Sequence, residues 1–125
     1  MAGRSDVIAL TISDENAAST TRIATAARPT AAFTLANTTH ANDTARNVTV
    51  TTAGTGDNEK TVTVVGTDVF GDSLTEIITS TGSAETVAGT SLFLSVASAT
   101  CSAQYAANVS VGTGSVCAQA IENSN

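Results

Sequence analysis

Two stretches decide the fold: Arg46-Asn-Val-Thr-Val-Thr-Thr52 and Thr61-Val-Thr-Val-Val65, in which apolar and hydroxyl side chains alternate. Successive side chains of a strand point to opposite faces, so strict alternation is typical of an antiparallel strand with one face on the core. Val and Thr suit a strand because their branched side chains pack well on a pleated surface. Outward from this centre, shorter alternating stretches lie at residues 91–96 and 108–111. Less regular strand candidates are residues 74–79, 32–35 and 115–121.

Turn-forming residues separate these stretches. Residues 53–60 contain Gly, Asp and Asn, and residues 67–72 contain Gly71 at the position that favours a left-handed conformation. Both segments predict hairpin connections. Strands at intervals of about 12 residues with turns between them favour an all-β fold. The sequence therefore predicts an antiparallel β-sandwich or small barrel of about six to seven strands over residues 31–125.

Residues 1–30 differ from the rest of the chain in composition. They are small and polar, with isolated apolar residues, and Pro29 closes the segment. A helix beginning near Ser13 would have an apolar stripe made mostly of Ala. We therefore expect an extended N-terminal arm with at most one helical turn.

The charge of the chain is uneven. Acidic and basic residues balance in residues 1–30, so the net charge of −6 falls entirely on residues 31–125. Such a body repels phosphate backbones and anionic lipid surfaces, which argues against nucleic-acid and membrane partners. No signal-peptide core is visible, and no stretch approaches the roughly 18 apolar residues of a membrane helix. We expect synthesis in the cytoplasm.

Candidate catalytic residues are few. His40 is the only histidine, and nothing in the sequence places a nucleophile beside it. Asp68 and Asp72 flank one turn, but paired acids in glycosidases work beside aromatic platforms, and this chain has no Trp and one Tyr. We expect Asp68 to accept hydrogen bonds from backbone amides of its own turn. The sequence predicts a protein that is not an enzyme.

Metal and cofactor signatures are also missing. Asp57-Asn-Glu59 lacks the ligand order of an EF-hand and is expected to be a solvated hairpin tip. Gly54-Thr-Gly56 lacks the third glycine of a dinucleotide fingerprint. Cys101 and Cys117 flank the last alternating stretch and are expected on adjacent strands, either as free thiols or as a disulfide that forms late.

The central stretch resembles a pattern in small structural proteins of tailed bacteriophages. The pattern is a Val-Thr alternation followed by Gly66-Thr-Asp68, then Gly71, Thr75-Glu76, a strand containing Phe93, and Val109-Ser-Val-Gly-Thr113. The resemblance covers roughly residues 45–115. It implies a virion component, either a capsid cement (decoration) protein or a tail-associated protein. Residues 99–106, which include Cys101, and the long arm depart from the pattern.

The resemblance implies the major capsid protein or other virion subunits as partners. The core is poor in aromatic residues, which make up 3% of the chain, so we also expect stabilisation by self-association into a homo-oligomer. The neutral arm can approach an acidic neighbour, and residues 7–12 have the character of a strand that adds to an open sheet edge. The expected contact residues are Arg4, Val7, Ile8, Leu10, Ile12, Arg22, Ile23 and Arg28.

Overall fold

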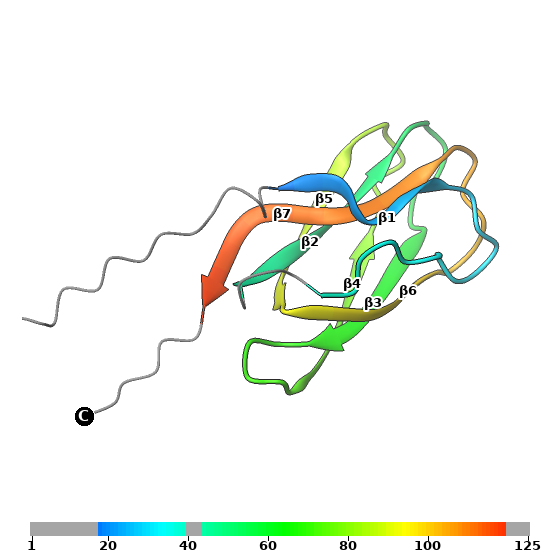
Figure 1. Ribbon diagram of the computed structural model, residues 1–125. Coiled ribbons are helices and arrows are strands. Elements are labelled where there is room, and N and C mark those ends of the chain that lie inside the picture. The colour runs from blue at the N-terminus through cyan, green and yellow to red at the C-terminus, as the bar shows by residue number, and fades with distance from the viewer. Residues whose placement is uncertain (1–17, 40–43, 120–125) are drawn as a thin grey trace, which may run out of the picture.

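The computed structural model describes residues 18–39 and 44–119, and none of these residues is helical. Seven strands form two antiparallel sheets that pack face to face (Figure 1). The strands are β1 (Ser19–Ala27), β2 (Thr44–Thr52), β3 (Thr61–Thr67), β4 (Ser73–Thr79), β5 (Thr86–Phe93), β6 (Ser95–Cys101) and β7 (Val109–Gln119). The all-β prediction is confirmed, and the two separate sheets make the fold a sandwich.

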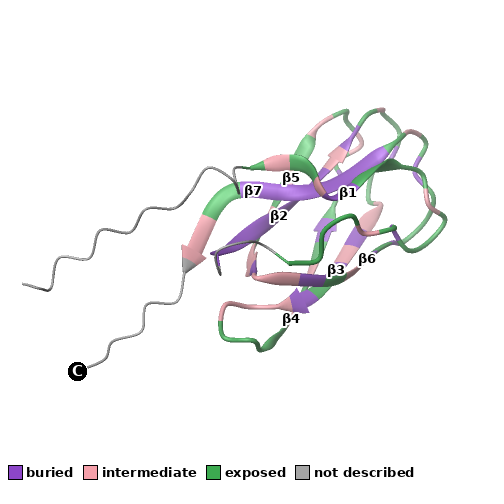
Figure 2. Cartoon of the chain, viewed as in Figure 1, coloured by how far each residue is buried: buried purple, intermediate pink, exposed green. Residues whose placement is uncertain are grey.

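The first sheet has the strand order β1-β7-β2-β5, and the second has the order β4-β3-β6. Alternate side chains of β3 face the space between the sheets, as the period-two pattern predicted. β2 departs from the pattern, because this central strand is buried on both faces. Val48 and Val50 of β2 share one core with Val62 and Val64 of β3, and all four are at most 1% exposed. Figure 2 shows this burial concentrated along β2 and β7 at the centre of the first sheet.

The first sheet contains a strand that the sequence did not predict. Residues 19–27, expected in the arm, form β1 and pair with β7. Ile23 is fully buried in the core. A Cβ atom on Gly112 of β7 would lie 2.0 Å from the carbonyl oxygen of Ser19, so the glycine permits this close approach of the two backbones. The body therefore extends at least to Ser19, and the expected boundary at residue 30 is wrong.

An irregularity in β2 is stabilised by Asn47. The register of β2 shifts beside this residue against both β5 and β7. The Asn47 side chain donates to the carbonyl of Gly89 on β5 and accepts from the amide of Val116 on β7, at 3.1 Å in each case. These bonds satisfy backbone groups that the bulges remove from the regular ladder.

The connections differ from the expected hairpins at one point. β3 and β4 do form a hairpin in continuous register, and Gly71 has a φ of 84° at its turn. Asp68 Oδ1 accepts hydrogen bonds from the amides of Phe70 and Asp72, which confirms the role expected of that carboxylate. Residues 53–60, in contrast, cross from one sheet to the other, because β2 and β3 belong to different sheets.

Four of the shorter or weaker strand predictions need correction. The stretch 91–96 is divided at Leu94, where the chain leaves the first sheet and enters the second. Residues 108–111 and 115–121 were expected as two strands, but β7 spans both as far as Gln119. Residues 32–35 form no strand and contribute an isolated bridge between Ala32 and Thr100 of β6.

The two cysteines are free. Cys101 ends β6 in the second sheet and Cys117 lies in β7 of the first sheet, so the expectation that their strands are adjacent is wrong. The buried Cys101 Sγ donates to the carbonyl oxygens of Ala31 (3.0 Å) and Pro29 (3.3 Å). The thiol therefore helps to hold the chain between β1 and the second sheet.

Candidate functional site

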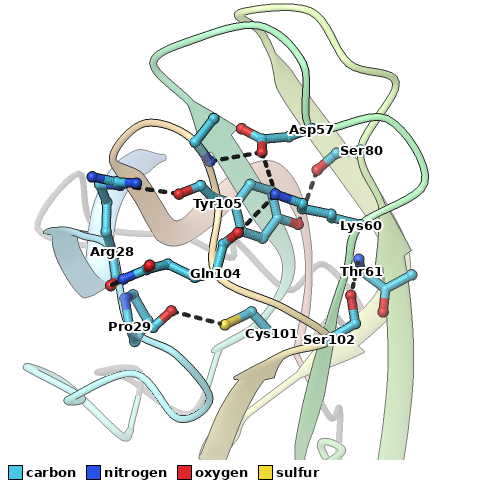
Figure 3. A network of polar contacts seen from close by, with 11 residues as sticks. Arg28, Pro29, Asp57, Lys60, Thr61, Ser80, Cys101, Ser102, Gln104 and Tyr105 are labelled. Atoms are coloured by element: carbon cyan, nitrogen blue, oxygen red, sulfur yellow. Dashed lines mark hydrogen bonds and ion pairs between the residues drawn. The ribbon is translucent and has the colours of Figure 1, made fainter.

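A group of hydrogen-bonded polar side chains lies at the loop end of the sandwich. We call it the loop cluster, and Figure 3 shows it. Its centre is Asp57, whose side chain is 1% exposed. Asp57 Oδ1 accepts hydrogen bonds from Lys60 Nζ at 2.8 Å and from the amide of Ala106 at 2.7 Å. The expectation of a solvated hairpin tip is therefore wrong at Asp57. The residues of the loop cluster are Arg28, Asp57, Lys60, Ser80, Cys101, Gln104 and Tyr105.

Lys60 and Tyr105 connect Asp57 to the other loops. Lys60 Nζ also donates to the carbonyl of Gln104 at 2.7 Å and lies 5.6 Å from the centroid of the Tyr105 ring, within the range of a cation–π contact. The Tyr105 ring is buried, and its hydroxyl lies 3.0 Å from Ser80 Oγ. One tyrosine thus joins the loop after β4 to the loop before β7.

The segment after β1 is tied into the same cluster. Arg28 Nε donates to the carbonyl of Tyr105 at 3.0 Å, and Gln104 Nε2 donates to the carbonyl of Arg28 at 2.8 Å. Together with the Cys101 thiol, these bonds fasten residues 28–31 to residues 101–105. The loop cluster therefore holds three loops and the end of β1 in one arrangement.

The electrostatics of the cluster favour an ionised Asp57. Burial raises the pKa of the Asp57 carboxyl, but the hydrogen bond and charge of Lys60 and the amides of Ala106 and Ala107 lower it more, so the pKa falls below its usual value. Burial raises the pKa of the Tyr105 phenol, and the hydrogen bond with Ser80 only partly offsets this. Both groups keep their ordinary charge near neutral pH.

The loop cluster is arranged so that its side chains hold the loops in place. Its hydroxyl, ammonium and amide groups are directed at one another or at backbone carbonyls, as Figure 3 shows. Asp57 Oδ2 is buried and has no hydrogen-bond partner. In the part of the chain that the structure describes, no three His, Cys, Asp or Glu side chains gather in a way that could hold a metal ion. The same part has no helix that could span a membrane.

The expected contact residues fall into two groups. Arg4, Val7, Ile8, Leu10 and Ile12 lie outside the described residues, as does His40. The other three belong to the body: Ile23 is in the core, Arg28 is in the loop cluster, and Arg22 is half-buried on β1 with a partner of its own.

Exposed apolar side chains mark a second feature, which the sequence did not predict. Among the described residues, the large hydrophobic side chains on the surface are Val65 (37% exposed), Phe70 (78%), Ile77 (62%) and Val116 (56%). Three of the four belong to the β3–β4 hairpin, which projects from the end of the sandwich opposite the loop cluster (Figure 1). The alternation did place Val65 and Ile77 on strands, but it did not show that the outer face of their sheet stays uncovered.

A carboxylate links this hairpin to the other sheet. Glu76 of β4 points toward β5, where its Oε1 accepts from the amide of Thr90 at 2.7 Å and its Oε2 accepts from the amide of Ser91 at 3.2 Å. Charge-assisted bonds of this kind are stronger than neutral ones. Glu76 therefore joins the edge strands of the two sheets.

In comparisons with known proteins, no family model, no curated protein and no solved structure matches the chain.

Proposed function

We propose that this protein is a non-enzymatic structural subunit of a tailed-bacteriophage virion, made in the host cytoplasm and then assembled. Its simplest role is that of a capsid cement (decoration) protein that binds the shell through its N-terminal segment and through self-association. The proposal rests on the resemblance of roughly residues 45–115 to small structural proteins of tailed bacteriophages. Its most specific part, Gly66-Thr-Asp68, lies at the end of β3 and the start of the turn that follows it. The major capsid protein is the proposed partner.

The loop cluster agrees with a structural role. Its groups engage one another, and Asp57 is held by Lys60 and by the backbone. A general acid or base must instead reach a reacting atom in a bound substrate. Asp68, the other acid considered, holds its own turn. The hydrogen bonds of Asp57 and Asp68 therefore stabilise the fold.

Attachment is assigned to the segment before β1. Arg22, Ile23 and Arg28 belong to the body, so the contact residues that remain in the proposal are Arg4, Val7, Ile8, Leu10 and Ile12. Their apolar side chains can be buried against a neighbour at about 1.5–3 kcal/mol each. Main-chain hydrogen bonds to an open edge add to this affinity.

Co-sedimentation with phage particles that lack the protein tests the proposal. The wild-type chain should bind, and a full-length variant carrying Ile8→Ser, Leu10→Ser and Ile12→Ser should lose at least about tenfold in affinity. Val116→Ser, which changes an exposed side chain of β7, is the matched control and should bind as wild type does. Equal binding by all three proteins would reject the N-terminal segment as the attachment, and no binding by any would reject the cement role.

A second candidate is a tail- or fibre-associated module that touches a host surface or another tail protein. One observation favours it: Phe70, at 78% exposure, stands at the tip of the β3–β4 hairpin, and exposed aromatic residues often anchor binding interfaces. Antibody labelling of particles distinguishes the two, because a cement protein is labelled over the whole head and a tail protein only at the tail.

A further inference from the structure

The sandwich has two open sides, and the described chain closes one of them. Residues 31–39 run between the edge strands β1 and β6. The amide of Ala36 donates to the carbonyl of Ile23 on β1, and the amide of Phe33 donates to the carbonyl of Ala99 on β6. The carbonyl of Thr38 accepts from Val96 of β6. These bonds cover edges that would otherwise present unpaired backbone groups.

The second side lies between the edge strands β5 and β4. The β5 edge is protected, because Glu76 accepts hydrogen bonds from the amides of Thr90 and Ser91. The strand is also irregular, with a register shift against β2 between Asn47 and Thr49. Side-chain capping and bulges are common means of blocking an edge.

The β4 edge has no such protection among the described residues. β4 pairs with β3 over its whole length without a bulge, and it contains neither Pro nor Lys. A backbone hydrogen bond flanks the ladder at each end: the amide of Asp68 donates to the carbonyl of Asp72, and the amide of Ser80 donates to the carbonyl of Lys60. Alternation along an antiparallel ladder then directs the N–H and C=O groups of Thr75, Ile77 and Thr79 outward, toward the open edge.

The side chains beside this edge suit an uncharged partner surface. On the outer face of β4 stand Ser73, Thr75, Ile77 and Thr79, and none is charged. Glu76, the one acidic residue of the strand, points the other way and is engaged with β5. A chain with a net charge of −6 repels a second copy of itself, and the uncharged outer face of β4 keeps this repulsion small where two copies meet along the edge.

We propose that β4 pairs with β4 of a second copy of this chain, antiparallel, about a two-fold axis at Ile77. This register sets Ile77 against its own equivalent and Thr75 against Thr79 of the other copy, and the second sheet becomes a continuous six-stranded sheet. An axis at Glu76 would place two carboxylates on directly opposite positions, which is unfavourable. The inference rests on the proposed self-association and names its surface.

The small size of the contact indicates a weak dimer. Seven residues of β4, at about 3.4 Å each and about 10 Å of sheet thickness, give roughly 240 Å² per partner. Stable complexes bury about 800 Å² per partner. The dimer is therefore weak in free solution, with a dissociation constant in the micromolar to millimolar range, and it forms readily where copies are held side by side on an assembly.

Cysteine cross-linking at the axis tests the register. In a Cys117→Ser background of the full chain, Ile77→Cys should form an interchain disulfide under mild oxidation. A hydrogen-bonded antiparallel pair separates Cα atoms by about 5.5 Å, within disulfide range. Thr75→Cys is the matched control: alone it should not cross-link, and mixed with Thr79→Cys it should. Cross-linking of Thr75→Cys alone, or none at Ile77→Cys, would overturn the proposed register.

Sedimentation equilibrium of the purified protein at up to about 1 mM tests the surface itself. The wild type should dimerise, Ile77→Lys should weaken the dimer at least about tenfold, and Val116→Lys should not weaken it. A strictly monomeric wild type, or a dimer that Ile77→Lys leaves unchanged, would overturn the inference. Particle binding is a separate readout: failure to dimerise with particle binding intact rejects this inference and keeps the proposed function.

Discussion

Asp57→Asn is the most informative change in the loop cluster. Asp57 is 1% exposed and holds Lys60 and the amide of Ala106 through one oxygen. Loss of one partner from a buried ion pair costs about 3–5 kcal/mol. The Lys60 side chain is 26% exposed, so water takes over part of its charge when the carboxylate is lost. We therefore expect a loss of about 2–3 kcal/mol in the free energy of unfolding, or roughly 10 °C in Tm for a chain of this length.

The pH dependence of this loss follows from the lowered pKa of Asp57. A carboxyl whose pKa is lower in the folded state stabilises the fold above its unfolded pKa of about 3.9, and this contribution is lost as the pH falls through the folded value. Wild type and Asp57→Asn should therefore differ in stability at pH 7, and the difference should shrink as the pH falls below about 3.9.

Urea denaturation at pH 7 and at pH 2.5 measures the difference in stability. The fluorescence of Tyr105, the only tyrosine, reports unfolding. Asp72→Asn, an exposed carboxylate in the β3–β4 turn, is the control and should change stability by less than about 0.5 kcal/mol. A loss at Asp57→Asn that is equally small, or that is unchanged at pH 2.5, would refute the reasoning.

Three further predictions concern the rest of the body. Removal of residues 1–17 should leave a cooperatively folding protein by circular dichroism, whereas removal of residues 1–30 should abolish the transition, because it deletes β1 and Ile23; two equally stable products would contradict the place of β1. Gly112→Ala should lower the free energy of unfolding in urea by about 2 kcal/mol or more, since its Cβ meets the backbone of Ser19, and a neutral effect would contradict that contact. Absorbance titration of Tyr105 should give a pKa above 10.0, with stability falling as the pH rises from the unfolded toward the folded value; a midpoint at or below 10.0 would contradict its burial.

The parts of the fold that could be predicted from sequence are those with a strong local pattern. Strict alternation located β2 and β3, and the turn chemistry of Asp68 and Gly71 located the β3–β4 hairpin. β1 has no such pattern, since Ser19–Ala27 contains one large apolar residue, Ile23. Its stability comes from pairing with β7 and from burial of that residue, and neither is visible in nine residues of small side chains.

Long-range contacts explain the other differences. Residues 53–60 carry ordinary turn residues, and only the partners of Asp57, as distant in sequence as Ala106, show that this loop crosses between sheets. Cys101 and Cys117 are close in sequence but lie in different sheets, because loop 102–108 makes the same kind of crossing. The loop cluster itself could have been suspected only from Tyr105, the single tyrosine of a chain poor in aromatic residues.

The number of copies per particle tests the proposed function most directly. Quantitative mass spectrometry of purified virions, with the major capsid protein as the internal standard, gives the ratio of the two proteins. A cement protein should be present in hundreds of copies, in a simple ratio to the capsid subunit. A handful of copies would move the protein to the tail, and its absence from purified virions would contradict a virion role altogether.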